Sequence, residues 1–153
     1  MMQIQLKTIL LAEDNPKDVE LTLEALSDNN LANQVVVAND GVEVMEYLRC
    51  EGKFRMRSPG LPVVLLLDIK MPRMDGLQVL REIRSDPALK MLPVVILSSS
   101  REESDLVVSY GLGVNAYVVK PVDFKEFMHA VQLLGSFWAL VNEPPPLEAD
   151  NGG

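Results

Sequence analysis

Short apolar runs that end in polar or charged residues alternate along this chain with longer segments of helical periodicity. The runs span residues 8–12, 34–38, 63–67, 93–97 and 116–119. We expect them to be strands, because they are short, rich in valine, leucine and isoleucine, and bounded by turn residues. The run 63–67 is apolar at every position, which is typical of a strand buried on both faces. The alternation predicts a doubly wound parallel α/β sheet of five strands.

The segments between these runs are expected to form helices that cover both faces of the sheet. Their predicted starts are near residues 15, 41, 75, 101 and 123, and Asp75 is expected to cap the third. The fourth is expected to span 101–112, and the last is expected to extend to 141. Between the second helix and the third strand, residues 53–62 form a basic loop that contains glycine and proline.

Chain length and patterning favour one domain. A chain of 153 residues, 48% of them hydrophobic, can bury a single core with little left for a second. We predict a domain over residues 1–142 and a disordered, acidic, proline-rich tail over residues 143–153.

Charge and hydropathy exclude several classes of protein. The formal net charge of -8 would repel nucleic acid and anionic membrane surfaces. No apolar run approaches the roughly 18 residues that span a bilayer, and the start of the chain lacks the pattern of a secretory signal. The single cysteine, Cys50, allows no internal disulfide. We therefore expect a cytoplasmic protein that binds neither nucleic acid nor membrane.

Polar side chains that can carry chemistry follow the predicted strands. Glu13 and Asp14 follow the first strand, Asp68 the third, Ser98 the fourth and Lys120 the fifth. In parallel sheets the carboxyl ends of the strands share one edge, where ligands bind. These five side chains are therefore expected to lie close together.

The residue types at this edge point to phosphoryl transfer. Three converging carboxylates repel one another unless a cation lies among them, and oxygen ligands suit Mg²⁺. Lys120 adds a positive charge and Ser98 a hydroxyl donor, both of which can stabilise charge on phosphoryl oxygens. Asp68 is then the candidate nucleophile.

The arrangement resembles the receiver domains of two-component response regulators. The resemblance covers about residues 8–141 and rests on residues that match in order and spacing. These are Glu13-Asp14, Asp68 followed by Met71-Pro72-Arg73-Met74-Asp75-Gly76, Ser98, Tyr117 and Lys120-Pro121. It implies a flavodoxin-like sheet of strand order 2-1-3-4-5, to which the helical pattern over 123–141 adds an extended C-terminal helix.

The resemblance also implies a role for each of these residues. Asp68 would accept the phosphoryl group, and Mg²⁺ would be bound by Asp14, Asp68 and the backbone carbonyl of Lys70. Glu13 would reach the metal through water. The implied protein is a signalling switch that catalyses its own Mg²⁺-dependent phosphorylation and dephosphorylation.

Three further residues would sense the phosphoryl group and relay its arrival. Lys120 would contact the phosphoryl group, and the Lys120-Pro121 peptide bond is usually cis in this family. Ser98 matches the switch hydroxyl, and Tyr117 matches the aromatic ring that turns inward when the hydroxyl moves toward phosphate.

Three segments are similar to a narrower subgroup, the small regulators paired with phytochrome histidine kinases. They are the loop 52–62, the run 93–102 and the ending 137–146. This similarity implies a phytochrome kinase as phosphodonor. It also implies a homodimer as the phosphorylated form. Independently, the last helix is apolar around more of its circumference than packing on one sheet requires, so we expect the dimer to form through this helix and the fifth-strand region.

Two positions depart from the family pattern or vary within it. Glu13 stands where the family more often has aspartate. Lys70 flanks the site, and we hypothesise that it screens the aspartyl phosphate from attacking water.

Other functions remain open at this stage. The chain could be a receiver-like scaffold that is not phosphorylated, although it retains every expected site group. A flavin mononucleotide carrier would need a phosphate-binding loop rich in glycine and hydroxyl groups after the first strand. An aspartate-nucleophile hydrolase would carry a second acid two residues after Asp68, where this chain has Lys70.

Overall fold

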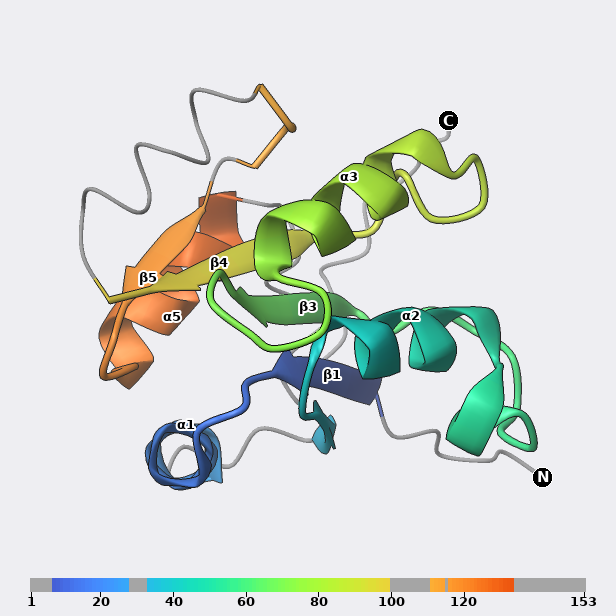
Figure 1. The fold of residues 1–153 in the computed structure, drawn as a ribbon. Helices are drawn as coiled ribbons and strands as arrows, with labels where there is room; N and C mark the ends of the chain where they lie inside the picture. The colour runs from blue at the N-terminus through green and yellow to red at the C-terminus, as the bar shows by residue number, and fades with distance from the viewer. Residues whose placement is uncertain (1–6, 28–32, 100–110, 115, 134–153) are drawn as a thin grey trace, which may run out of the picture.

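The computed structural model describes residues 7–27, 33–99, 111–114 and 116–133 (Figure 1). In chain order the described elements are β1 Lys7–Ala12, α1 Pro16–Ser27, β2 Asn33–Ala38, α2 Gly41–Arg49, the 3₁₀ helix η1 Gly52–Phe54, β3 Val64–Asp68, α3 Gly76–Ser85, β4 Val94–Ser98, β5 Tyr117–Val119 and α5 Phe124–Leu133. The expected helix over 101–112 lies almost entirely outside the described residues. So do the extension of the last helix beyond Leu133 and the tail 143–153.

The described strands form one parallel sheet in the order β2-β1-β3-β4-β5, which confirms the predicted fold class. In the register, Leu10 of β1 lies between Val36 of β2 and Leu65 of β3. Since β1 and β3 have a neighbour on each side, all of their backbone groups can join the hydrogen-bond ladder. The chain thus crosses over after β2, and the carboxyl ends of β1 and β3 meet at this switch point.

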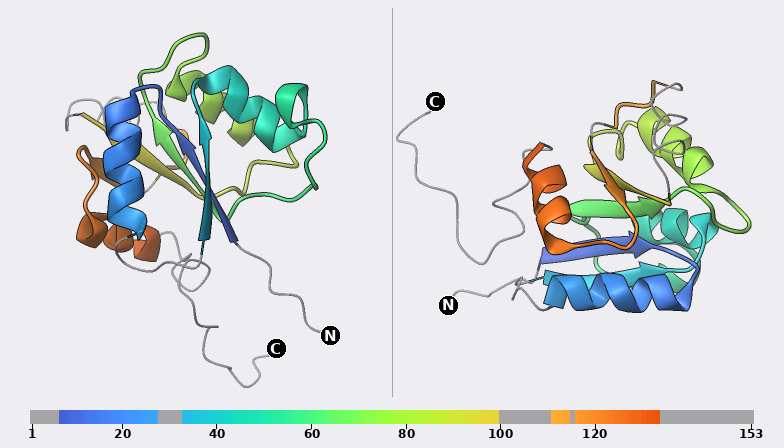
Figure 2. Two further views of the ribbon diagram at one scale, coloured as in Figure 1. Left: turned by 90° about the horizontal axis from the view of Figure 1, so that it is seen from below. Right: turned by 90° about the vertical axis from the view of Figure 1, so that its left-hand side faces the viewer.

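Helices cover both faces of the sheet, with α1 and α5 on one side and α2 and α3 on the other (Figure 2). Alternate residues of the central strands supply the two cores. Leu65 and Leu67 pack in the cluster with α2 and α3, whereas Leu66 packs with Leu26 of α1 and Phe127 of α5. Burial on both faces explains why β3 reads as an uninterrupted apolar run.

Three strands begin one residue later than the sequence predicts. The runs 63–67, 93–97 and 116–119 become Val64–Asp68, Val94–Ser98 and Tyr117–Val119. In the ladder the first paired residues are Val64 with Ile9, Val94 with Leu65 and Tyr117 with Ile96. The last pairs are Asp68 with Leu97 and Ser98 with Val119. Asp68 and Ser98 are therefore the last residues of their strands. The loop predicted over 53–62 also differs, since Lys53 and Phe54 belong to η1.

Two glycines let the loop after β3 pack closely under the site. A Cβ atom at Gly76 would overlap the carbonyl oxygen of Asp68, and one at Gly41 would overlap the carbonyl oxygen of Met74. Instead the Gly41 N–H donates to that Met74 oxygen at 3.1 Å. Asp75 caps α3, as predicted, in a reciprocal capping box with Gln78. The Gly76 N–H also donates to Ile69 O at 2.7 Å, which joins the two ends of the loop.

Among the helices within the described ranges, none has the length and apolar character needed to cross a membrane.

Candidate functional site at the carboxyl edge of the sheet

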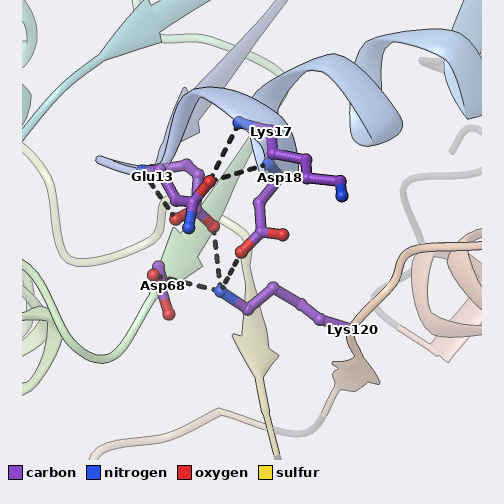
Figure 3. Close-up of polar contacts among 6 residues, drawn as sticks. Glu13, Lys17, Asp18, Asp68 and Lys120 are labelled. Atoms are coloured by element: carbon purple, nitrogen blue, oxygen red, sulfur yellow. Dashed lines mark hydrogen bonds and ion pairs between the residues drawn. The ribbon is translucent and has the colours of Figure 1, made fainter.

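An acidic cluster lies where the carboxyl ends of β1 and β3 meet (Figure 3). Glu13 and Asp14 directly follow β1, and Asp68 ends β3. One carboxylate oxygen from each of the three lies within 4.8 Å of the others. The sequence prediction that these carboxylates converge is therefore confirmed for all three.

Lys120 reaches this cluster from the end of β5. Its Nζ donates to Glu13 Oε1 at 3.1 Å, to Asp68 Oδ2 at 3.3 Å and to Asp18 Oδ2 at 3.1 Å (Figure 3). The peptide bond from Lys120 to Pro121 is cis, as the family resemblance implies. The ammonium group thus bridges residues that are far apart in the sequence.

Asp18 is the residue of this constellation that the sequence analysis missed. It lies in the first turn of α1, where Asn15 Oδ1 accepts hydrogen bonds from the backbone N–H groups of Lys17 and Asp18. This cap directs the start of the helix over the cluster. The sequence did hold a signal for Asp18. It is an acidic residue in the first turn of the helix that directly follows Glu13-Asp14, and that turn lies at the same edge of the sheet.

The carboxylates differ sharply in exposure. Glu13 is only 1% exposed and Asp68 only 5%, whereas Asp14 is exposed. Glu13 is held from both sides, because its backbone N–H donates to Ala38 O and its Oε2 accepts from the Asn15 N–H. Glu13 and Asp68 therefore form the buried part of the cluster, and solvent or a ligand can enter it beside Asp14.

Burial and like charge dominate the electrostatics of Glu13. Desolvation, together with the negative charge of Asp68, raises the pKa of Glu13 to about 7, although hydrogen bonds from Lys120 and Asn15 oppose the rise. For Lys120, burial lowers the pKa, but the hydrogen bond to Asp18 and the charges of Asp68 and Glu13 outweigh burial and raise it. Lys120 is therefore firmly cationic, and its charge does not fully offset those of the carboxylates.

The donor set fits a hard divalent cation. Glu13, Asp14 and Asp68 supply only oxygen ligands, which Mg²⁺ and Mn²⁺ prefer. Three carboxylates gather beside the single ammonium group of Lys120, and a divalent ion would offset the remaining negative charge. The residues present therefore fit a metal site.

The other predicted site residues lie at or near the same edge. The backbone of Ser98 ends β4 and pairs with Val119. Lys70 lies in the loop after β3 and is exposed. Tyr117 begins β5, is half-buried against the α2–α3 core, and donates from its hydroxyl to Val114 O at 3.3 Å.

The loop between β3 and α3 is tied to α2 by an ion pair. Arg73 Nε donates to Asp40 Oδ2 at 2.7 Å, while Asp40 Oδ1 accepts from the Glu43 N–H and caps α2. Burial opposes ionisation of Asp40, but the hydrogen bonds from Arg73 and Glu43 outweigh it and lower the pKa. This carboxylate is fully compensated, unlike those of the acidic cluster.

Comparison with known proteins places this geometry in a family. The family model of the response regulator receiver domain matches residues 9–132. Response regulator Rcp1 of Synechocystis sp. is 39% identical over 132 residues, which cover 86% of this chain and 88% of Rcp1. A solved structure of Rcp1 in its Mn²⁺-bound form has a TM-score of 0.70 at 36% identity, covering 92% of this chain and 99% of that chain.

Two further solved structures are similar over nearly the whole chain. The bacteriophytochrome response regulator AtBRR has a TM-score of 0.87 at 56% identity and covers 92% of this chain and 100% of its own. The phosphorylated cyanobacterial phytochrome response regulator RcpA has a TM-score of 0.70 at 42% identity, covering 88% of this chain and 95% of that chain.

Proposed function

The chain belongs to the response regulator receiver domain family of two-component signalling proteins, and we propose that it is a phospho-accepting switch in which Asp68 is the phosphorylated residue. The observation that carries the proposal is the Lys120 ammonium group, 3.3 Å from Asp68 Oδ2 and directly beside the acidic cluster. A carboxylate with a cation and oxygen ligands around it can act as a nucleophile toward an anionic phosphoryl donor.

The proposed reaction transfers a phosphoryl group from a histidine kinase. A carboxylate oxygen of Asp68 forms a bond to phosphorus while the phosphorus–nitrogen bond of phosphohistidine breaks, and the imidazole nitrogen leaves with the bonding electrons. Dephosphorylation is attack of water on the same phosphorus, which releases inorganic phosphate and restores Asp68. Lys120 places its charge where the phosphoryl oxygens gather negative charge in both steps.

The metal would be held by Asp14, Asp68 and the backbone carbonyl of Lys70, with Glu13 acting through a water molecule. Bound Mg²⁺ would neutralise charge on the phosphoryl oxygens and lower their repulsion from the carboxylates. Both oxygens of Glu13 already accept hydrogen bonds, which supports an indirect role for this residue. The Mn²⁺-bound form of the relative Rcp1 supports a divalent ion at this site.

Ser98 and Tyr117 would relay phosphorylation to the surface. In this proposal the Ser98 hydroxyl moves to the phosphoryl group and the Tyr117 ring turns inward behind it. The Tyr117 ring is half-buried, and its hydroxyl is held by a 3.3 Å hydrogen bond to Val114 O, so a modest change could shift it. Lys70, exposed beside the site, would shield the phosphoryl group from water.

The partner assignments follow the relatives. AtBRR and RcpA are described as phytochrome response regulators, which supports a phytochrome histidine kinase as phosphodonor. The transfer would take place in the cytoplasm. We further propose that residues 1–142 form the receiver domain, with residues 143–153 as a disordered tail. A homodimer would form through the C-terminal helix and the β5 region, where Val119 is 43% exposed.

Intact mass spectrometry tests the phosphorylation. After incubation with Mg²⁺ and acetyl phosphate, the protein should gain one phosphoryl group, and the gain should be absent in Asp68→Asn and after removal of metal. The matched control is Asp123→Asn, which removes an exposed carboxylate outside the cluster and should leave labelling intact. If neither acetyl phosphate nor a cognate kinase labels the protein, the chain acts as a scaffold instead.

Sedimentation tests the dimer separately. The phosphorylated protein should sediment as a dimer, and Val119→Asp should shift it toward monomer without preventing phosphorylation. A monomer both with and without phosphate would overturn the dimer proposal and leave the phosphorylation proposal standing.

A further inference from the structure

The hydrogen-bonding capacity of the Lys120 ammonium group is fully used in this structure. An ammonium group has three N–H donors, and Lys120 directs them to Glu13, Asp18 and Asp68. A phosphoryl oxygen can therefore gain a hydrogen bond from Lys120 only if one of these partners gives its bond up. Which partner leaves depends on what each carboxylate can bond to afterwards.

While a phosphodonor approaches and Asp68 is still a carboxylate, Asp18 is the partner that can leave at the lowest cost. Its side chain is 30% exposed, against 1% for Glu13 and 6% for Asp68. Water can replace the ammonium group at an exposed carboxylate, whereas a buried carboxylate that loses its partner pays the full penalty of desolvation. The first turn of α1 also stabilises the charge of Asp18 once Lys120 has moved, because helix N-termini favour negative charge.

We propose that Asp18 is a positioning residue that competes with the phosphoryl group for Lys120. In the unphosphorylated protein Asp18 holds the ammonium group on the α1 side of the cluster. Lys120 exchanges this bond for an oxygen of the incoming phosphoryl group before the bond between Asp68 and phosphorus forms. The inference rests on the proposed function, since it concerns how readily Asp68 accepts a phosphoryl group.

The competition makes a directional prediction. Removing the charge of Asp18 should leave Lys120 more readily available and should speed phosphorylation of Asp68. If Asp18 had only a structural role, its substitution would disturb the site and slow the reaction. Acceleration therefore distinguishes competition for Lys120 from a structural role. The expected size is roughly two- to fivefold, the range for losing one partly exposed ion pair.

The test is the initial rate of labelling by acetyl phosphate at saturating Mg²⁺, followed by intact mass. Asp18→Asn should be accelerated, because the amide keeps the shape of the side chain and removes its charge. Asp18→Glu, which restores the charge, should label at close to the wild-type rate. Glu20→Gln removes one charge from an exposed position on the same helix and should also leave the rate unchanged.

A double-mutant cycle shows whether the effect passes through Lys120. In a Lys120→Gln background, labelling should be slow and Asp18→Asn should add no acceleration. The proposal is overturned if Asp18→Asn labels no faster than wild type, if Glu20→Gln accelerates labelling equally, or if the acceleration persists in Lys120→Gln. Failure of the proposed function is distinct, because the wild-type protein itself would then remain unlabelled.

Discussion

The two edges of the sheet hold their charged side chains in opposite ways. At the carboxyl edge, Lys120 is shared among three carboxylates, and the cluster retains excess negative charge. At the amino edge, beside Thr8 and Gln34, Arg57 donates to the carbonyl oxygens of Tyr47, Ser58 and Gly60. Its guanidinium carbon also lies 3.9 Å from the centre of the Tyr47 ring.

This difference separates a charge that serves stability from charges that serve function. The amino edge matches one guanidinium group with fixed carbonyl dipoles and an aromatic face, so nothing further is needed to satisfy it. The carboxyl edge leaves buried carboxylates close together, an arrangement that costs stability until a cation arrives. Charge that is left uncompensated in the fold is thus available to bind a metal and a phosphoryl group.

The largest effect is expected when Lys120 is removed. Lys120→Ala leaves Glu13 and Asp68 buried without their cation, and it should lower the free energy of unfolding by roughly 3 kcal/mol at pH 8 without metal. Addition of Mg²⁺ should recover part of this loss. Urea titration with chelator and with Mg²⁺ measures both effects, and Lys125→Ala, at an exposed position on α5, is the control. Equal stability of Lys120→Ala and wild type would contradict the stabilisation of Glu13 and Asp68 by Lys120.

At the opposite edge, Arg57→Ala should cost about 2 kcal/mol, because it removes hydrogen bonds to three carbonyl groups and the contact with the Tyr47 ring. The loss should be the same with and without Mg²⁺, and labelling by acetyl phosphate should stay at the wild-type rate. Arg57→Lys should recover only part of the stability, since an ammonium group lacks the planar fork. A change in labelling rate would show that the two edges are coupled.

The pH dependence of stability should differ between the edges. The folded protein holds the pKa of Glu13 at about 7, above the value of 4.5 expected in an unfolded chain. The folded state therefore binds a proton more tightly, so lowering the pH from 8 toward 5 should stabilise the metal-free protein by at most about 1.4 kcal/mol per pH unit. Thermal unfolding across this range should show the slope in wild type and lose it in Glu13→Gln. An unchanged slope in Glu13→Gln would show that ionisable groups other than Glu13 cause the pH dependence of stability.

A smaller effect is expected from a compensated carboxylate at the carboxyl edge itself. Asp40 caps α2 and accepts a hydrogen bond from Arg73, so Asp40→Ala should cost about 1 kcal/mol. Because this carboxylate lacks the excess charge of the cluster, Mg²⁺ should not alter the loss. Asp40→Asn, which keeps an oxygen acceptor, should recover most of the stability. If Mg²⁺ did restore the stability of Asp40→Ala, the metal would be stabilising the carboxyl edge beyond the acidic cluster.

Local patterns in the sequence were sufficient to predict the strands, their parallel arrangement and the convergence of Glu13, Asp14 and Asp68. An apolar run of strand length followed by a carboxylate is informative because parallel strands bring their carboxyl ends to one edge. The strand order and the individual roles required the resemblance to a family. The starts of three strands were predicted one residue early, because hydropathy does not report where a ladder begins.

The partners of Lys120 and Arg57 could not be read from the sequence. Lys120 is 102 residues from Asp18 and 107 from Glu13 along the chain, and no local pattern encodes a contact over such a separation. Arg57 lies in a loop that composition marks only as basic, yet its donors are satisfied by backbone carbonyls whose directions depend on the folded loop. Hydrophobic periodicity decides which face of an element is buried, whereas the pairing of charges depends on the distances that packing of the whole sheet creates.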